Sequence, residues 1–252
     1  MASPSDAGSF DRVHDEDLSL SHGSTRFDAV LLDLYDTLVW SDWYAWQGRV
    51  ANLLDVSHEA VGHAFSETRP ARSIGRHPDT KADLTAVLVA AGIEPTPVLL
   101  AELIEMEDEM ATSVRLYDDS LEVLRALRSR GIPTALVSNC SHNTRPIVDR
   151  LGLEREFDAV ILSFEVGAMK PDPAIYREAL SRVGEPDPVA IADLVFVDDQ
   201  IRYCDGAAAV GLQTFVILRP EEALEGRPVD MNGHRPIYDL SALVDDVEPE
   251  RD

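Results

Sequence analysis

Three apolar runs in this 252-residue chain each end directly on a polar residue, and this pattern constrains the fold more than any other feature. The runs are four residues long and lead into Asp33, Ser138 and Asp198. Continuous apolar runs of this length are typical of strands buried on both faces of a parallel sheet. In open α/β sheets, ligands bind at the carboxyl ends of such strands. The sequence therefore predicts one site that gathers these three polar residues.

The rest of the chain alternates between predicted strands and helices. Apolar runs predict further strands at residues 159–162 and 214–218, and apolar residues at helical spacing predict helices at 144–151, 173–183 and 205–210. Strands that alternate with helices indicate a parallel sheet with helices on its faces. We therefore predict the α/β fold class, with a doubly wound parallel sheet.

A long helical block follows the first predicted strand, residues 27–32. Apolar residues recur near a 3.6-residue period within residues 50–61, 84–91 and 99–106. The block, about 75 residues from position 40 onward, contains no convincing strand pattern. We expect it to form a separate helical unit inserted into the α/β part.

Asp33 is the candidate nucleophile of the predicted site. A carboxylate is a weak nucleophile, but it forms covalent intermediates when the electrophile is held in line with it. The alternative role for Asp33 is to cap a following helix. Asp198 and Asp199 are adjacent carboxylates that repel each other, and proteins commonly offset such repulsion by binding a hard cation such as Mg²⁺. Their alternative role is that of two polar residues at the start of a helix.

Lys170 is the candidate positive charge of the site. The chain has only two lysines, Lys81 and Lys170, so a lysine here indicates a need for a compact point charge. The alternative is a turn before the helix at 173–183. Ser138 and Asn139 offer a hydroxyl, an amide and backbone N–H groups to a phosphoryl or carboxylate oxygen. Their alternative role is a turn at the end of a strand.

These four motifs, in this order, resemble those of the haloacid dehalogenase-like (HAD) superfamily of hydrolases. The resemblance covers roughly residues 27–243. It implies a Rossmann-like α/β core at residues 26–39 and 116–252, with a helical cap at residues 40–115 inserted after the first strand. It also implies Mg²⁺-dependent hydrolysis of a small phosphorylated metabolite through an aspartyl-phosphate. Asp33, Asp198, Asp199 and the backbone carbonyl of Tyr35 would then hold the Mg²⁺.

Tyr35 departs from the pattern of the family's phosphatases. These enzymes have a second Asp two residues after the nucleophile, which protonates the leaving group and then activates water. A phenol, with a pKa near 10, is a poor general base at pH 7. Asp36 is a possible substitute. On an extended strand, however, its side chain would point away from the face that carries Asp33 and Tyr35, unless the chain already turns at this point. Its alternative role is helix capping.

Two other functions fit the same residues. Asp33-Leu34-Tyr35 resembles the opening motif of 2-haloacid dehalogenases, which need no metal and displace halide through an aspartyl ester. Ser138-Asn139 followed by Ser141 is similar to them as well. Asp198-Asp199 instead resembles the metal-dependent enzymes of the superfamily. Because the usual second carboxylate is absent, a catalytically weak scaffold that binds a ligand or partner is a third hypothesis.

The predicted cap carries aromatic and basic residues of interest. The three tryptophans, Trp40, Trp43 and Trp46, are spaced as on one helical face and would line an apolar substrate pocket or the core of the cap. Four arginines are candidate contacts for a substrate carboxylate or phosphate, or are ordinary solvated residues. They are Arg49, Arg69, Arg72 and Arg76.

Composition narrows the classes of partner. The formal net charge of −24 argues against nucleic-acid binding, which needs clustered basic residues. Cys140 and Cys204 are the only cysteines, so no disulfide framework is expected. Residues 1–25 lack the pattern of a secretory signal and are expected to form a disordered acidic tail. With no apolar run long enough to span a membrane, we expect a cytoplasmic protein that acts on a small anionic substrate. The oligomeric state is not predicted.

Overall fold

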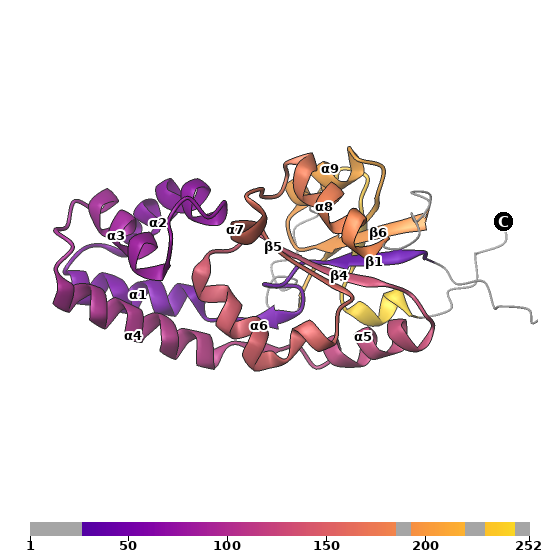
Figure 1. Cartoon of the computed structure of the whole chain (residues 1–252), viewed down its shortest axis with the longest axis horizontal. Helices are drawn as coiled ribbons and strands as arrows, with labels where there is room; N and C mark the ends of the chain where they lie inside the picture. The colour runs from indigo at the N-terminus through magenta and orange to yellow at the C-terminus, as the bar shows by residue number, and fades with distance from the viewer. Residues whose placement is uncertain (1–26, 185–192, 220–229, 245–252) are drawn as a thin grey trace, which may run out of the picture.

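The computed structural model describes residues 27–184, 193–219 and 230–244, and it shows an elongated molecule with an α/β part at one end and a helical part at the other (Figure 1). The predicted tail, residues 1–25, lies outside the described residues. Within these ranges, no helix has both the length and the apolar content required to cross a bilayer.

The α/β part contains one six-stranded sheet in which all neighbouring strands are parallel. The strand order is β5-β4-β1-β6-β7-β8. The strands are β1 (Ala29–Leu32), β4 (Thr134–Ser138), β5 (Ala159–Leu162), β6 (Leu194–Asp198), β7 (Gln213–Ile217) and β8 (Arg235–Ile237). The predicted doubly wound parallel sheet is therefore confirmed, although β8 was not predicted.

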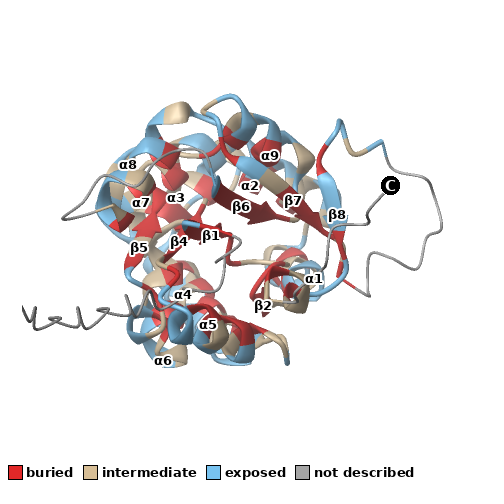
Figure 2. Ribbon diagram, turned by 90° about the vertical axis from the view of Figure 1, so that its right-hand side faces the viewer, coloured by how far each residue is buried: buried red, intermediate tan, exposed pale blue. Residues whose placement is uncertain are grey.

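Successive residues of β1 show why the buried strands are apolar throughout. Val30 and Leu32 pack in one cluster with α5 (Ser120–Ser129) and α6 (Arg145–Leu151). Ala29 and Leu31 point to the opposite face. There they pack with α8 (Pro173–Val183) and α9 (Ile201–Ala208). Both faces of the sheet are thus covered, and Figure 2 shows the buried strands lying between the helices.

The helical part has a core of its own. It consists of α1 (Trp43–Leu54), α2 (His58–Ser73), α3 (Thr80–Ala90) and α4 (Pro97–Ser113). Trp46, Phe65, Leu88 and Leu103 are among the buried residues that these helices share. Side-chain caps begin the helices: Asp42, Ser57, Asp79 and Thr96 each accept a hydrogen bond from a backbone N–H in the first turn.

The chain leaves and re-enters the α/β part through two short antiparallel strands. These are β2 (Val39–Trp40) and β3 (Arg115–Leu116), and neither was predicted. They are only two residues long, too short to give an alternating pattern. The predicted cap boundaries at residues 40 and 115 remain predictions, and we use the word cap for the helices α1–α4 between these strands.

The cap approaches the core closely beside α2. Gly75 has a φ of +66°, and a Cβ on this residue would lie 2.1 Å from the carbonyl oxygen of Phe164 in α7 (Ser163–Val166). Only glycine fits this contact without a shift of the backbone. Asp83 of α3 makes a second contact, in which its Oδ2 lies 3.0 Å from Nδ1 of His142 in the core. The cap is therefore anchored at two points beside the carboxyl edge of the sheet.

Candidate active site

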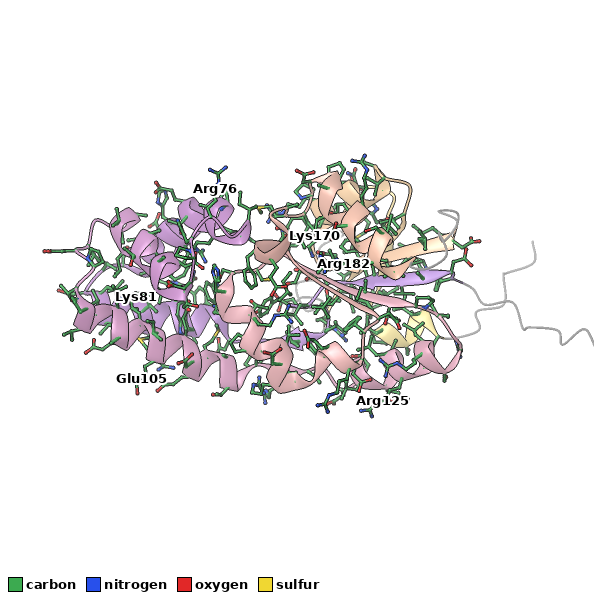
Figure 3. The ribbon with its side chains drawn as sticks, viewed as in Figure 1. Arg76, Lys81, Glu105, Arg125, Lys170 and Arg182 are labelled. Carbon is green, nitrogen blue, oxygen red and sulfur yellow. The ribbon has the colours of Figure 1, made fainter. Side chains whose placement is uncertain are left out.

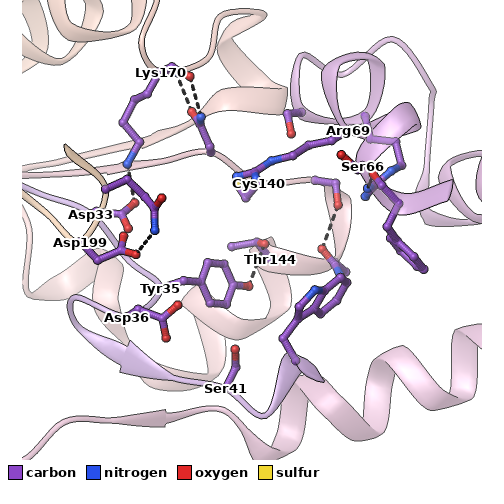
Figure 4. Close-up of a pocket in the computed structure, with 18 of the residues that line it drawn as sticks. Asp33, Tyr35, Asp36, Ser41, Ser66, Arg69, Cys140, Thr144, Lys170 and Asp199 are labelled. Carbon is purple, nitrogen blue, oxygen red and sulfur yellow. Dashed lines mark hydrogen bonds and ion pairs between the residues drawn. The ribbon is translucent and has the colours of Figure 1, made fainter. Parts of the chain in front are cut away.

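The predicted site residues follow the central strands, where the strand order reverses. From β1, the chain adds β4 and β5 on one side, and β6, β7 and β8 on the other. β1 and β6 are neighbours, with Leu32 paired to Val197, so Asp33 and Asp198 emerge side by side. A pocket of about 420 Å³ opens there between the core and the cap (Figure 4). This is the position at which open α/β sheets bind ligands.

Lys170 joins the two strand ends. Its Nζ donates to Asp33 Oδ1 at 2.5 Å and to Asp198 Oδ2 at 2.6 Å, and its side chain is fully buried. Figure 4 shows the Lys170 side chain reaching Asp33. A buried charge must be paired, and Lys170 is paired twice. Burial alone would lower the pKa of Lys170, but the carboxylates of Asp198 and Asp33 raise it above its usual range, so the amine stays charged.

The carboxylates exceed the positive charge available to them. Burial raises the pKa of Asp33 to about 6, although Lys170 opposes the shift. Burial likewise raises the pKa of Asp198 to about 6. The pKa of Asp199 rises to about 7, through burial and then through the charge of Asp33. One ammonium group therefore lies among three buried or half-buried acids and pairs with two of them, which leaves excess negative charge around Lys170.

This donor set fits a divalent cation. Oxygen atoms from Asp33, Asp198 and Asp199 all lie within 4.8 Å of one another. Carboxylate oxygens are the ligands that Mg²⁺ prefers, and its charge would offset the excess negative charge of the three acids. Asp198 also accepts the backbone N–H of Gln200 at 2.8 Å, which holds its carboxylate in place. A role for the Tyr35 carbonyl as a further ligand remains a prediction.

Asn139 lines the pocket, but its side chain is occupied by the chain around Lys170. Asn139 Oδ1 accepts the backbone N–H of Lys170 at 2.7 Å, and Nδ2 donates to the Lys170 carbonyl at 2.8 Å. The side-chain amide that was expected to contact a substrate oxygen is thus engaged with the backbone of Lys170. Ser138 is 1% exposed, and its hydroxyl has no hydrogen-bond partner among the described residues. Its binding role remains a prediction.

Tyr35 is held as a neutral phenol in the pocket wall. Its hydroxyl and Thr144 Oγ1 are 3.0 Å apart, and burial raises its pKa above the usual range. A phenolate base is therefore excluded near neutral pH. Asp36 has a φ of +56°, so the chain turns and Asp36 lines the same pocket as Asp33 and Tyr35. The alternation of side chains along a strand does not extend to Asp36, because the extended strand ends at Leu32.

The cap supplies the facing wall of the pocket. Among the predicted cap arginines, Arg69 and Arg72 line it. Arg72 is largely buried and donates to the Phe65 carbonyl at 2.9 Å. Arg49 is instead paired with Glu109 on the surface, and Arg76 is exposed away from the pocket.

The tryptophans do not share one helical face. Trp46 is buried in the cap core, and Trp43 stacks on it with ring centroids 4.7 Å apart. Trp43 also lines the pocket. Trp40 lies in β2, where Arg115 covers its ring at 4.7 Å. The spacing of three was misleading for Trp40 because the helix begins only at Trp43.

Several lining residues were not singled out from the sequence. Arg202 and Tyr203 line the pocket because α9 begins at Ile201, four residues before the predicted start. Thr144 contributes the partner of Tyr35. Ser163 accepts the backbone N–H of Cys140 at 2.9 Å and so fixes the loop after β4. The polar residues just beyond each strand end were the available signal for Arg202, but nothing local indicates Ser163.

Comparison with known proteins identifies the class. The model of the haloacid dehalogenase-like hydrolases matches residues 27–211, and the chain belongs to this family. The human haloacid dehalogenase-like hydrolase domain-containing protein 3 is 31% identical over 133 residues, and the match spans about half of each protein (52%).

Two further relatives carry enzyme names. The glyceraldehyde 3-phosphate phosphatase of Methanopyrus kandleri is 30% identical over 203 residues, which cover 76% of this chain and 84% of that protein. A crystal structure of a dehalogenase with an intermediate complex superposes with a TM-score of 0.62 at 25% identity, and the match covers 86% of this chain and 96% of that chain. The comparisons thus show the family, and the relatives include both a phosphatase and a dehalogenase.

Proposed function

We propose that this hydrolase is a Mg²⁺-dependent phosphatase that acts on a small phosphorylated metabolite through an aspartyl-phosphate at Asp33. The observation that carries the proposal is the cluster of Asp33, Asp198 and Asp199 around a single lysine. Among the carboxylates of the described residues, Lys170 contacts only Asp33 and Asp198, so Asp199 adds a carboxylate that Lys170 does not pair, and a divalent cation would offset this charge. The phosphatase of M. kandleri supports the same reaction class.

The contacts of Asp33 suit nucleophilic attack. Its pKa of about 6 keeps it ionised at pH 7, and Lys170 fixes its orientation through Oδ1. A carboxylate oxygen of Asp33 forms a bond to phosphorus, while the bond from phosphorus to the leaving oxygen breaks and that oxygen takes a proton. Water then attacks the acyl-phosphate, releases phosphate and regenerates Asp33. Asp33, Asp198 and Asp199 would hold a Mg²⁺, whose charge would offset that of the anionic phosphoryl oxygens.

Proton transfer is the weak part of this active site. Tyr35, at the usual acid–base position, remains protonated and is able only to donate a hydrogen bond. Asp36 is the carboxylate that lines the pocket beside it (Figure 4). We therefore propose slow turnover of esters with poor leaving groups, with Asp36 as the candidate source of any acid–base assistance.

A second candidate function is the displacement of halide from a 2-haloacid. The neutral phenol of Tyr35 in the wall around Asp33 favours it, because an aspartyl ester forms without proton donation to a halide leaving group. The likeness to the dehalogenase structure supports this alternative. A catalytically weak scaffold that binds a ligand or partner is the third candidate, and the missing second carboxylate is its basis.

One assay separates the three candidates. A panel of aryl phosphates, alkyl phosphates and 2-haloacids is incubated with the full chain, once with Mg²⁺ and once with a chelator, and phosphate and halide release are measured. We expect phosphate release that the chelator abolishes. Halide release with the chelator present would replace the phosphatase proposal with the dehalogenase. No release from any compound would favour the scaffold.

A further inference from the structure

Two guanidinium groups converge on one neutral hydroxyl in the pocket wall. Arg69, from α2 of the cap, donates to the Tyr203 hydroxyl at 3.2 Å. Arg202, from α9 of the core, donates to the same oxygen at 2.8 Å. Both arginines are exposed and line the pocket, whereas Tyr203 is buried. A single uncharged oxygen therefore holds two like charges together across the boundary between cap and core.

This pairing is unusual for so acidic a chain. The sequence has 46 acidic and 22 basic residues, and arginines such as Arg145 and Arg219 pair with carboxylates. Arg69 and Arg202 form no ion pair with any residue in the described ranges. Two cations that share a neutral acceptor lack the anion that would satisfy them.

The ring of Tyr203 connects these arginines to the reacting end of the pocket. Lys170 Nζ, which donates to Asp33, lies 5.0 Å from the ring centroid, and the Arg202 guanidinium lies 4.6 Å from the same centroid. Both charged groups therefore pack against the same aromatic ring. The two ends of the pocket differ in charge, since carboxylates dominate near Asp33 and guanidinium groups dominate near Tyr203.

We propose that Arg69 and Arg202 form a subsite for a carboxylate, and that the substrate is a small phosphate ester carrying this second anionic group. The inference rests on the proposed phosphatase function, which places the phosphoryl group at Asp33. A carboxylate accepts paired hydrogen bonds from a guanidinium, and these charge-assisted bonds are stronger than the present ones to a phenol. Tyr203 holds both arginines in position until the carboxylate arrives.

The test compares two phosphate esters of similar size. Phosphoglycolate ends in a carboxylate, and 2-hydroxyethyl phosphate ends in a hydroxyl group. With the full chain and Mg²⁺, we expect kcat/KM to favour phosphoglycolate by about tenfold or more. Arg69→Gln and Arg202→Gln should each lower kcat/KM for phosphoglycolate about tenfold, mainly through KM, and should lower kcat/KM for the hydroxyl ester much less. Arg76→Gln is the matched control, because Arg76 is an exposed cap arginine outside the pocket lining.

A binding arm separates the subsite from the reaction. Calorimetry measures binding of phosphoglycolate and of 2-chloropropionate to Asp33→Asn, alone and combined with Arg69→Gln. Arginine-dependent binding of phosphoglycolate without turnover by the wild type would overturn the phosphatase function and leave the subsite standing. Binding of 2-chloropropionate that depends on Arg69, with chloride release by the wild type, would support the carboxylate subsite. It would overturn the proposal that the substrate is a phosphate ester. An equal loss for both esters, or no loss for either, would overturn the subsite even if both are hydrolysed.

Discussion

The core side and the cap side of the pocket hold their charges in opposite ways. On the core side, Lys170 is fully buried and its Nζ contacts the carboxylates of Asp33 and Asp198. On the cap side, Arg69 is exposed and donates to the neutral hydroxyl of Tyr203. The first group of charges is paired within the folded chain, whereas the second has no opposite charge beside it.

This difference indicates a division of labour between the two parts of the molecule. Buried, mutually paired charges cannot reorganise without a large free-energy cost, which suits groups that must be in place before the reaction. Exposed arginines reorient at little cost and contribute when a ligand satisfies them. We infer that the core side sets the chemistry and the cap side selects the substrate. The predictions below test this contrast in order of their expected effect on turnover.

Asp33→Asn should have the largest effect, a loss of turnover of more than about a thousandfold, because it removes the nucleophile. The fold should survive, since the amide is nearly isosteric and Lys170 keeps its contact with Asp198. Phosphate release is measured together with the urea midpoint of unfolding. Asp28→Asn, at an exposed position before β1, is the control. Retention of more than about a tenth of wild-type turnover would contradict covalent catalysis at Asp33.

Tyr35→Asp should come next and should increase phosphatase activity. General acid–base assistance is typically worth about 10²–10⁴-fold, and Tyr35 as a neutral phenol supplies no base. The gain should be largest for alkyl phosphates, whose leaving groups need a proton, and smallest for aryl phosphates. If the wild type already hydrolyses alkyl phosphates rapidly, the argument is wrong, and Asp36→Asn should then abolish that activity. A haloacid substrate would reverse the sign, because the new charge would repel its carboxylate.

The core side of the pocket was easier to predict from the sequence than the cap side. Asp33, Ser138 and Asp198 were predicted because each follows a buried strand, and parallel strands end at a common edge. Lys170 was recognised because lysine is scarce in the chain. The contacts on the cap side depend on how the cap packs against the core. Arg69 and Tyr203 are 134 residues apart, and no local periodicity brings them together. The side on which Asp36 lies stayed open, because a positive φ at a non-glycine residue has no clear sequence signal.

Mg²⁺ should raise the melting temperature, and Asp199→Ala should abolish the shift. A ligand at a hundred times its Kd stabilises the native state by about 2.7 kcal/mol. Without Mg²⁺, Asp199→Ala should be no less stable than the wild type, because Asp199 is a half-buried acid repelled by Asp33. Thermal unfolding is followed with Mg²⁺ and with a chelator, and Asp28→Ala serves as the control. An unchanged shift in Asp199→Ala would place the cation elsewhere.

Glu107→Gln should leave turnover unchanged and alter only the pH dependence of stability. Glu107 lies on the buried face of α4, its Oε2 has no hydrogen-bond partner among the described residues, and burial raises its pKa from 4.5 to about 8. The native state therefore holds a proton that the unfolded state has released between these pH values. The free energy of unfolding of the wild type should thus fall as the pH rises from about 4.5 to about 8 and change little above that.

A neutral amide removes this penalty, so the difference between Glu107→Gln and the wild type should grow in favour of the variant across that window. Urea unfolding at pH 5, 7 and 9 measures it, with Glu105→Gln as the control for loss of an exposed acid from the same helix (Figure 3). A difference that is constant with pH would show that Glu107 is ionised in the folded cap. Glu107 would then be a buried charge of the cap in addition to the largely buried Arg72.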